Sequence, residues 1–306
     1  MTITSLLTRR YLRRGLARPN LTYYFWRFVA NGQRTRRLLA TPPEFGDTPA
    51  TVETLRQQGI VVGDAAQFLS EPGQQALRSA TERVLQASRS DAVSRLVRGE
   101  AADTNRQKDF MIHLVKYPDG IPVDDPLLAV ALDRRLLEIV GSYLGLWPSL
   151  YSISAWLHYP TDAPAQQSQL WHRDPEDLTL VKVFIYLNDV DEQCGPFSYV
   201  PATQPFGART AAANALEGQK RVTDAAMGEL FPPDSWKVCT GAANTMILAD
   251  TVGYHRGGKP SAGQRILIAF TFTSGAPIKS PAVRVQTTPD WASAEIQRAA
   301  IRQILR

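Results

Sequence analysis

The sequence of 306 residues has few cysteines, no long apolar run and no acidic side chain before Glu44. Cys194 and Cys239 are too few for a disulfide framework, and their separation fits no zinc-ligand spacing. No apolar run approaches the roughly 20 residues that cross a bilayer, and the first residues lack the apolar core of a secretory signal. We therefore expect a soluble protein, for which a reducing cytoplasm fits best.

Positive charge is concentrated at the N-terminus. Before Glu44 the chain carries nine arginines, at positions 9, 10, 13, 14, 18, 27, 34, 36 and 37. Aromatic residues between Tyr23 and Phe28 lie among them, a combination that suits weak contact with an anionic membrane surface or with nucleic acid. The alternatives are a solvated extension whose aromatic residues pack on the main body, and an organellar transit peptide. No feature indicates a specific nucleic-acid partner.

The pattern of the chain changes near residue 149. Before it, apolar residues at helical spacing predict helices within 71–99 and 126–145, and Ile60 begins a short strand. After it, turn clusters separate short β-rich runs at 151–159, 181–187, 196–200, 244–250 and 264–273. Many strands without intervening βαβ helices favour an antiparallel sandwich or jelly roll over a parallel sheet.

The fold class that follows is mainly β with flanking α-helices, around a double-stranded β-helix of the cupin-like jelly-roll type. Residues 1–45 are expected to be a basic N-terminal extension and residues 46–290 one catalytic domain. A helical insertion is expected at about 207–235, and a C-terminal helix at 291–306.

Two of the four histidines lie in conspicuous settings. In LWHRDPEDL, His172 and Asp174 are two residues apart, a spacing that places both side chains on the same face of a strand. His255, in ADTVGYHRGG, follows the apolar run NTMILAD and supplies a third ligand. Two imidazoles and one carboxylate suit non-haem Fe(II) and leave other metal positions open. Each motif is weak by itself, because a His-x-Asp pair more often forms a surface hydrogen bond.

The position of an arginine strengthens this interpretation. Arg265 lies ten residues after His255 and opens the strand RILIAFTF. A guanidinium there suits a bidentate ion pair with the distal carboxylate of 2-oxoglutarate. Alone, Arg265 would be interpreted as an exposed cation at a strand edge.

These motifs resemble the phytanoyl-CoA dioxygenase family of Fe(II)/2-oxoglutarate oxygenases. The resemblance rests on QSQLWHRDPEDLTLVKVFIYLNDVDEQCGPFSYVPATQ and ADTVGYHRGGKPSAGQRILIAFTFTS and covers approximately residues 100–275. It implies metal binding by His172, Asp174 and His255, and 2-oxoglutarate binding by Arg265. Where relatives commonly read Pro-Gly-Ser-His, this chain has Pro201-Ala202-Thr203-Gln204, a departure that bears on substrate preference.

The resemblance extends to two further positions. It implies that Lys116 reaches the cosubstrate from an early strand and that Tyr186 lines the same pocket; a solvated lysine and a core tyrosine are equally open alternatives. Trp156 and Arg256 flank the motifs and are candidates for the substrate pocket, although core packing is the simpler role for Trp156.

The expected activity is an Fe(II)- and 2-oxoglutarate-dependent dioxygenase that uses O₂ to hydroxylate a small organic or lipid-like substrate, releasing succinate and CO₂. Asp174 argues against the related halogenases, in which a small residue replaces the carboxylate. A catalytically silent or sensor-type member of the fold remains an alternative, as does a cupin-type metalloenzyme that does not use 2-oxoglutarate. Neither the substrate nor the oligomeric state follows from the sequence.

Overall fold

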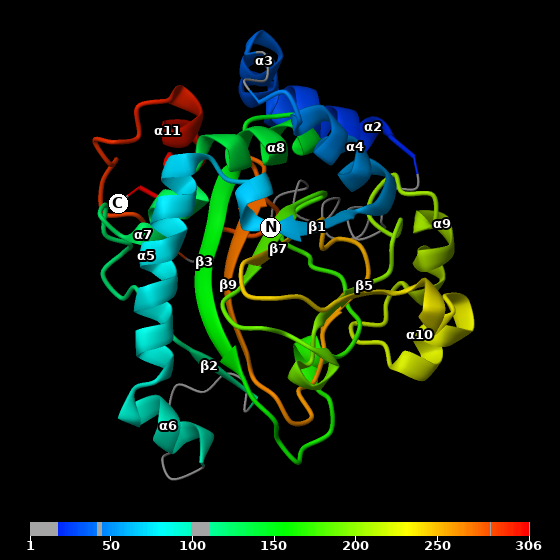
Figure 1. Cartoon of the computed structure of the whole chain (residues 1–306). Helices are drawn as coiled ribbons and strands as arrows, with labels where there is room; N and C mark the ends of the chain where they lie inside the picture. Colours follow the sequence, from blue (N-terminus) through cyan, green and yellow to red (C-terminus); the bar gives the residue numbers. More distant parts are fainter. Residues whose placement is uncertain (1–17, 42–44, 99–109, 282, 306) are drawn as a thin grey trace.

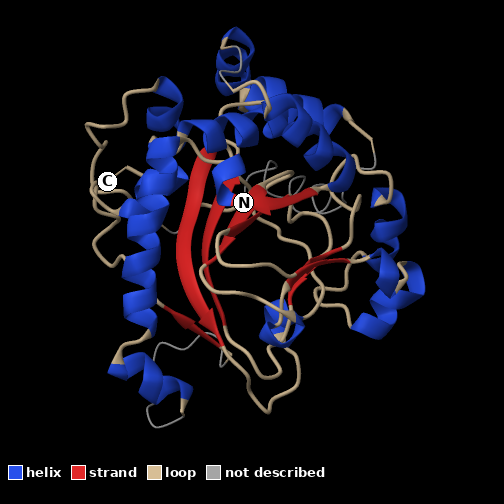
Figure 2. Cartoon of the chain, in the orientation of Figure 1, coloured by secondary structure: helices blue, strands red, loops and turns tan. Residues whose placement is uncertain are grey.

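The computed structural model describes residues 18–41, 45–98, 110–281 and 283–305. Part of the expected basic extension, including Arg9, Arg10, Arg13 and Arg14, therefore lies outside the described residues. Figure 2 shows helices along one side of a strongly curved sheet and, on its other side, a smaller sheet with further helices beside it. None of the helices in these ranges combines the length and apolar character that a membrane span requires.

The larger sheet has six strands in the order β1-β7-β4-β9-β3-β2, and every neighbouring pair is antiparallel. Its strands are β1 (Ile60–Asp64), β2 (Met111–His113), β3 (Ser149–His158), β4 (Val181–Tyr186), β7 (Thr245–Ala249) and β9 (Arg265–Thr273). The smaller sheet is also antiparallel and has the order β6-β5-β8. Its strands are β5 (Phe197–Tyr199), β6 (Lys237–Cys239) and β8 (His255–Gly257). The prediction of antiparallel rather than parallel strands is confirmed.

Alternation along the strands gives the larger sheet two apolar faces. One face, which includes Val183 of β4 and Phe270 of β9, packs against helices in the main core. The opposite face, which includes Phe184 and Leu267, packs against Phe197 of the smaller sheet in a second core. Because successive side chains on a strand point in opposite directions, β4 and β9 serve both cores at once.

Helices cover the outer face of the larger sheet, as Figure 1 shows for α5, α7 and α8. The helices before the second strand are α2 (Leu21–Tyr24), α3 (Gly32–Ala40), α4 (Thr48–Gln58), α5 (Glu71–Ser88) and α6 (Asp91–Val97), and η1 (Phe25–Ala30) joins the first two. The later ones are α7 (Pro126–Ala131), α8 (Arg134–Leu144), α9 (Thr210–Ala213), α10 (Asp224–Leu230) and α11 (Glu295–Ile301). The short 3-10 turns are η2 (Ala65–Gln67), η3 (Gln167–Gln169), η4 (Glu192–Cys194), η5 (Asn214–Leu216) and η6 (Pro233–Ser235).

The apolar block predicted over 126–145 is two helices rather than one. Asp133 separates them, and its side chain accepts a hydrogen bond from the backbone N–H of Leu136 as the N-cap of α8. The apolar periodicity runs through both helices, so it does not show where the first helix ends. The break is marked by Asp133, a residue type that favours the N-cap position of a helix.

Candidate active site

The candidate metal ligands lie where the chain passes between the two sheets. His172 forms an isolated antiparallel bridge with His255, in which the N–H of each donates to the carbonyl of the other at 2.9 and 3.0 Å. Two residues further on, the N–H of Asp174 donates to the carbonyl of Thr251 at 2.8 Å. The bridge therefore brings together ligands that lie 83 residues apart in the sequence.

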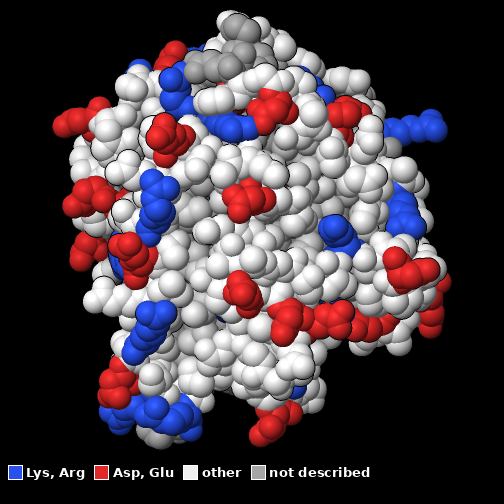
Figure 3. All heavy atoms as spheres, viewed as in Figure 1, with Lys and Arg blue, Asp and Glu red and all other residues white. Residues whose placement is uncertain are grey.

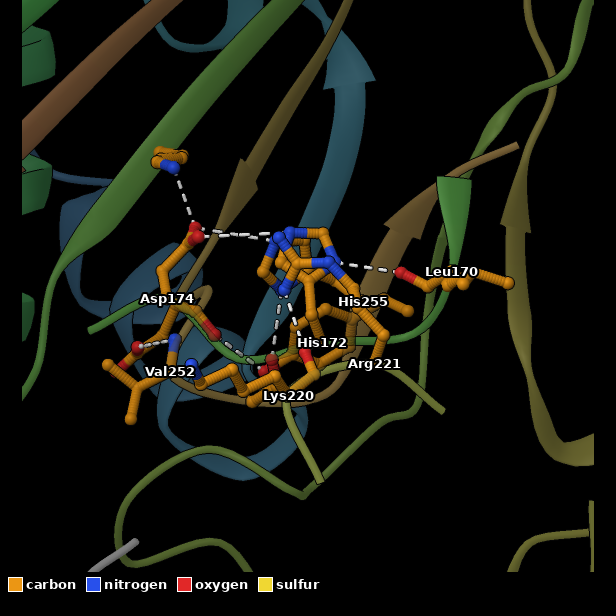
Figure 4. Close-up of polar contacts among 11 residues, drawn as sticks. Leu170, His172, Asp174, Lys220, Arg221, Val252 and His255 are labelled. Carbon is orange, nitrogen blue, oxygen red and sulfur yellow. Dashed lines mark hydrogen bonds and ion pairs between the residues drawn. The ribbon is translucent and has the colours of Figure 1, made fainter. Parts of the chain in front are cut away.

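The three side chains converge on a small volume. Nε2 of His255 lies 3.3 Å from Oδ2 of Asp174, and Nε2 of His172 lies 3.8 Å from Oδ1 of the same carboxylate. One ligand atom from each residue lies within 4.8 Å of the other two, and all three residues are buried. Figure 4 shows the imidazoles side by side, facing the carboxylate. Ligand atoms at this separation fit around a single metal ion.

Backbone carbonyls fix the tautomer of both imidazoles. Nδ1 of His172 lies 2.8 Å from the carbonyl of Leu170, and Nδ1 of His255 lies 3.0 Å from that of Gly253. A carbonyl can only accept a hydrogen bond, so Nδ1 carries the proton in each ring. In the neutral form of such a ring the lone pair is on Nε2, which in both residues faces Asp174, as metal binding requires.

The protonation states also suit a cation. Burial, followed by the nearby His255, lowers the pKa of His172 to about 3, so this imidazole is neutral at physiological pH. Burial alone would raise the pKa of Asp174, but the ammonium of Lys182 holds it well below its usual value. His172 and Asp174 thus offer a lone pair and a negative charge without first losing protons.

Lys182 is a member of the site that the sequence interpretation missed. Its ammonium lies 2.6 Å from Oδ2 of Asp174, on the inner face of β4. Burial would lower the pKa of Lys182, but Asp174 and Glu176 raise it above the ordinary value, so the ion pair stays charged. The available signal was a lysine at an alternate position of the apolar strand VKVFIYL, where a solvated side chain is out of place.

Arg265 is buried without a hydrogen-bond acceptor. The residue is 2 % exposed, and its Nε and Nη1 have no partner among the described residues. Gly257, two residues after His255, lets it approach closely, since a Cβ there would lie 3.1 Å from Nη2. Burial lowers the pKa of Arg265, which shows the energetic cost of the unpaired charge. A buried guanidinium of this kind favours an anionic ligand.

Arg265 and Lys182 lie at different positions along the strands of the larger sheet. Arg265 pairs in register with His158, whereas Lys182 pairs with Thr271, six residues further along β9. At the rise of a β-strand this is roughly 20 Å along the sheet. The two cations therefore serve different parts of the site.

The other predicted residues are placed as follows. Tyr186 is buried next to the arginine; its hydroxyl donates to the carbonyl of Cys239 at 2.9 Å and accepts from the N–H of Phe197 at 3.0 Å. Lys116 is exposed in the loop after β2. Among the described contacts, it has none with the histidine cluster.

Trp156 and Arg256 form contacts of their own. The indole of Trp156 donates to Nδ1 of His113 at 3.2 Å on the inner face of β3. Arg256 pairs with Asp224 and stacks over the rings of Trp171 and Trp236. The strand alternation of β8 turns Arg256 away from the side on which the preceding histidine lies.

Fold and cluster together define a class of protein: antiparallel, two-sheet β proteins with a His-Asp-His triad between the sheets. No family profile matches the sequence, and no curated protein matches it either. Several solved structures do match the chain. The non-haem α-ketoglutarate-dependent epimerase SnoN from nogalamycin biosynthesis is 13% identical, with a TM-score of 0.50 over 76% of this chain and 85% of its own.

SnoN in complex with Fe³⁺, α-ketoglutarate and nogalamycin RO matches with 14% identity and a TM-score of 0.50, over 76% of this chain and 86% of that one. EctD from S. alaskensis with bound Fe is 16% identical, with a TM-score of 0.49 over 86% and 90% of the two chains. At these identities, the likeness to SnoN extends to the fold alone.

Proposed function

We propose that the protein is a non-haem Fe(II)- and 2-oxoglutarate-dependent dioxygenase of the phytanoyl-CoA dioxygenase family, with a closed jelly-roll core at residues 46–290. It would use O₂ to hydroxylate a C–H bond of a small organic or lipid-like substrate, with release of succinate and CO₂. One observation supports this most: a metal-type triad and a buried arginine without an anionic partner occur together among the described residues. Two free, buried cysteines are consistent with a cytoplasmic location.

The residues present fit iron. Two imidazoles and one carboxylate are the ligand set of non-haem Fe(II) oxygenases and leave positions for a chelating cosubstrate and O₂. When bound, the metal with 2-oxoglutarate and O₂ supplies the oxidising power that no side chain possesses. The carbonyls of Leu170 and Gly253 aim the two imidazoles, and Lys182 keeps Asp174 ionised and oriented.

Arg265 would bind the distal carboxylate of 2-oxoglutarate. Nη1 and Nε have no acceptor among the described residues, and a carboxylate at the end of the guanidinium would accept from the parallel N–H groups of Nη1 and Nη2 at once. Tyr186 lies beside the guanidinium of Arg265. Gly257 has no side chain and so leaves room for this guanidinium. Burial of this pair excludes water from the cosubstrate end of the pocket.

Binding and turnover assays test the proposal. Calorimetry should show 2-oxoglutarate binding that depends on Fe(II), and succinate should form when a suitable substrate from a panel is added. His172→Ala should abolish metal binding and turnover. Arg265→Ala should raise the KM for 2-oxoglutarate by at least about tenfold, because it removes a buried charge partner.

The exposed Arg284, whose hydrogen bonds to described residues all go to backbone carbonyls, provides the matched control: Arg284→Ala should leave this KM unchanged. Turnover that survives in His172→Ala, or succinate formation without iron, would refute the proposal.

A further inference from the structure

The N-terminal helical segment has two different apolar faces. α2 and η1 run without a break from Leu21 to Ala30. On the inner face, Trp26 is buried and its indole donates to Oδ1 of Asp177 at 2.9 Å. The ring of Tyr23 packs edge-on against Phe206 at 4.7 Å between centroids. These contacts attach the segment to the main body.

The outer face of the same segment is also apolar. Five large apolar residues of the segment are exposed instead of packed on the main body, and the rings of two of them, Tyr24 and Phe28, stack at 6.3 Å between centroids. Their exposed fractions are high: Leu21 88%, Tyr24 50%, Phe25 59%, Phe28 52% and Val29 64%. We call these five residues the outer stripe. A contiguous apolar stripe on a surface marks an interaction site, whereas single exposed apolar residues do not.

A basic cavity adjoins the outer stripe. It has a volume of about 620 Å³, and Phe28 and Val29 form part of its wall. Arginines from two ends of the chain complete it: Arg34, Arg36, Arg37 and Arg302. Burial, then the charges of Arg302 and Arg37, lowers the pKa of Arg34 to about 10, a sign of crowded positive charge.

Two of these arginines remain available to a ligand. Arg34 donates to the carbonyls of Trp147, Pro148 and Ala299, and Arg37 pairs with Glu295. Arg36 and Arg302 are exposed and have no acidic partner among the described residues. On the face shown in Figure 3, acidic and basic side chains are mixed, whereas the chain has no acidic residue before Glu44.

We propose that this surface docks on an anionic lipid bilayer. The outer stripe would lie in the interfacial layer, and Arg36 and Arg302 would bind lipid phosphates at the mouth of the basic cavity. An amphipathic helix with apolar residues on its outer face and arginines beside it is the arrangement that binds in the plane of a bilayer. Nucleic acid fits less well, because Leu21 and Val29 offer no ring for base stacking.

Flotation with vesicles tests the docking. Full-length protein should float with vesicles of phosphatidylcholine mixed with phosphatidylglycerol and bind far less to phosphatidylcholine alone. High salt should weaken the binding, because the arginine contribution is screened. Failure of the wild type to float with the anionic vesicles would refute the proposal.

Paired variants separate the two contributions. Leu21→Ser/Phe25→Ser/Phe28→Ser should lower the vesicle affinity by about tenfold or more, since the apolar area drives insertion. Arg36→Glu/Arg302→Glu should lower it to a similar extent on anionic vesicles. The controls are Val238→Ser and Lys237→Glu, exposed positions on β6, which should have no effect. Equal losses in variants and controls would count against the assigned surface.

A site-specific probe reports insertion directly. Cys194 and Cys239 are buried, so an environment-sensitive fluorophore can be attached to a new surface thiol. At Phe28→Cys its emission should shift to the blue on anionic vesicles, and at Val238→Cys it should not. An absent shift at position 28 would overturn the proposal, as would self-association that the serine variants abolish, or tighter binding to an RNA oligonucleotide than to vesicles.

Discussion

At the scale of single residues, the site depends on which cation balances the negative charge of Asp174. The residue is 9% exposed, so its negative charge would be costly without a cation. In the metal-free protein Lys182 supplies that cation at 2.6 Å. A bound divalent ion would supply a second positive charge on the side of the imidazoles.

This balance predicts how Lys182→Met behaves. Without metal, the variant should lose about 3 kcal/mol of unfolding free energy, because the buried carboxylate loses its partner. Saturating Fe(II) should recover much of the loss, so metal should raise the Tm of the variant more than that of the wild type. Thermal unfolding under anaerobic conditions, with and without metal, measures both effects.

A double variant supplies the control. Lys182→Met/Asp174→Asn removes both charges and should be more stable than Lys182→Met alone in the absence of metal. Equal losses with and without metal would mean that Lys182 supports the sheet and not the carboxylate.

The sequence predicts that the side chains of His172 and Asp174 point to the same side of the backbone, and in the structure both enter the same cluster. A spacing of two residues is enough to determine this wherever the backbone is extended. The sequence did not reveal Lys182. A lysine in an apolar strand is visible in the sequence, but the carboxylate it pairs with depends on which strand crosses the ligand segment.

At the scale of elements, short strands place the third ligand. β8 has three residues and begins at His255, and β5 pairs with it in register. Sequence patterns predicted the longer strands within a few residues, for instance 264–273 against the observed Arg265–Thr273. They missed β2, β6 and β8, which have three residues each and little alternation; β5 is equally short but was predicted from the β-rich run 196–200.

The joint between α4 and β1 offers a test at this scale. Gly59 ends α4 with φ of 75°, and a Cβ there would overlap Oε1 of Gln204 and the hydroxyl of Tyr199. Gly59→Ala should therefore lower the unfolding free energy by about 3 kcal/mol, from left-handed strain and overlap together. Denaturant unfolding measures the loss.

Gly218 is the matched control, because it has φ of 93° but nothing within 4 Å of an added Cβ. Gly218→Ala should cost only about 1 kcal/mol, the strain alone. Similar losses in the two variants would show that the contact with Gln204 and Tyr199 contributes nothing.

At the scale of the whole molecule, Asp177 connects the N-terminal helices to the sheets. Its carboxylate accepts hydrogen bonds from the indole of Trp26 and from the backbone N–H groups of Leu178 and Ser274. Burial raises the pKa of Asp177 to about 6, although these hydrogen bonds lower it. The folded protein therefore binds this proton more tightly than the unfolded chain does.

A pH dependence follows from this shift. The stabilisation is complete below the ordinary pKa of 3.8 and is lost as the pH rises through about 6. The wild type should thus lose about 3 kcal/mol over this window relative to Asp177→Asn, which cannot titrate. Unfolding curves of both proteins at several pH values measure the difference; parallel pH profiles would contradict the raised pKa.

The sequence by itself determined the antiparallel β character, the longer strands and the same-sided His172 and Asp174. These follow from alternation and turn residues, which act over a few positions. Only the tertiary structure decided that His255 bridges to His172, that Lys182 pairs with Asp174 and that Arg265 is buried with no acceptor for Nε and Nη1 in the described part of the chain. It also decided which face of the N-terminal helix stays exposed, since both faces are apolar. The physical reason is that such contacts join residues far apart in the chain, and their geometry is fixed by sheet register and packing.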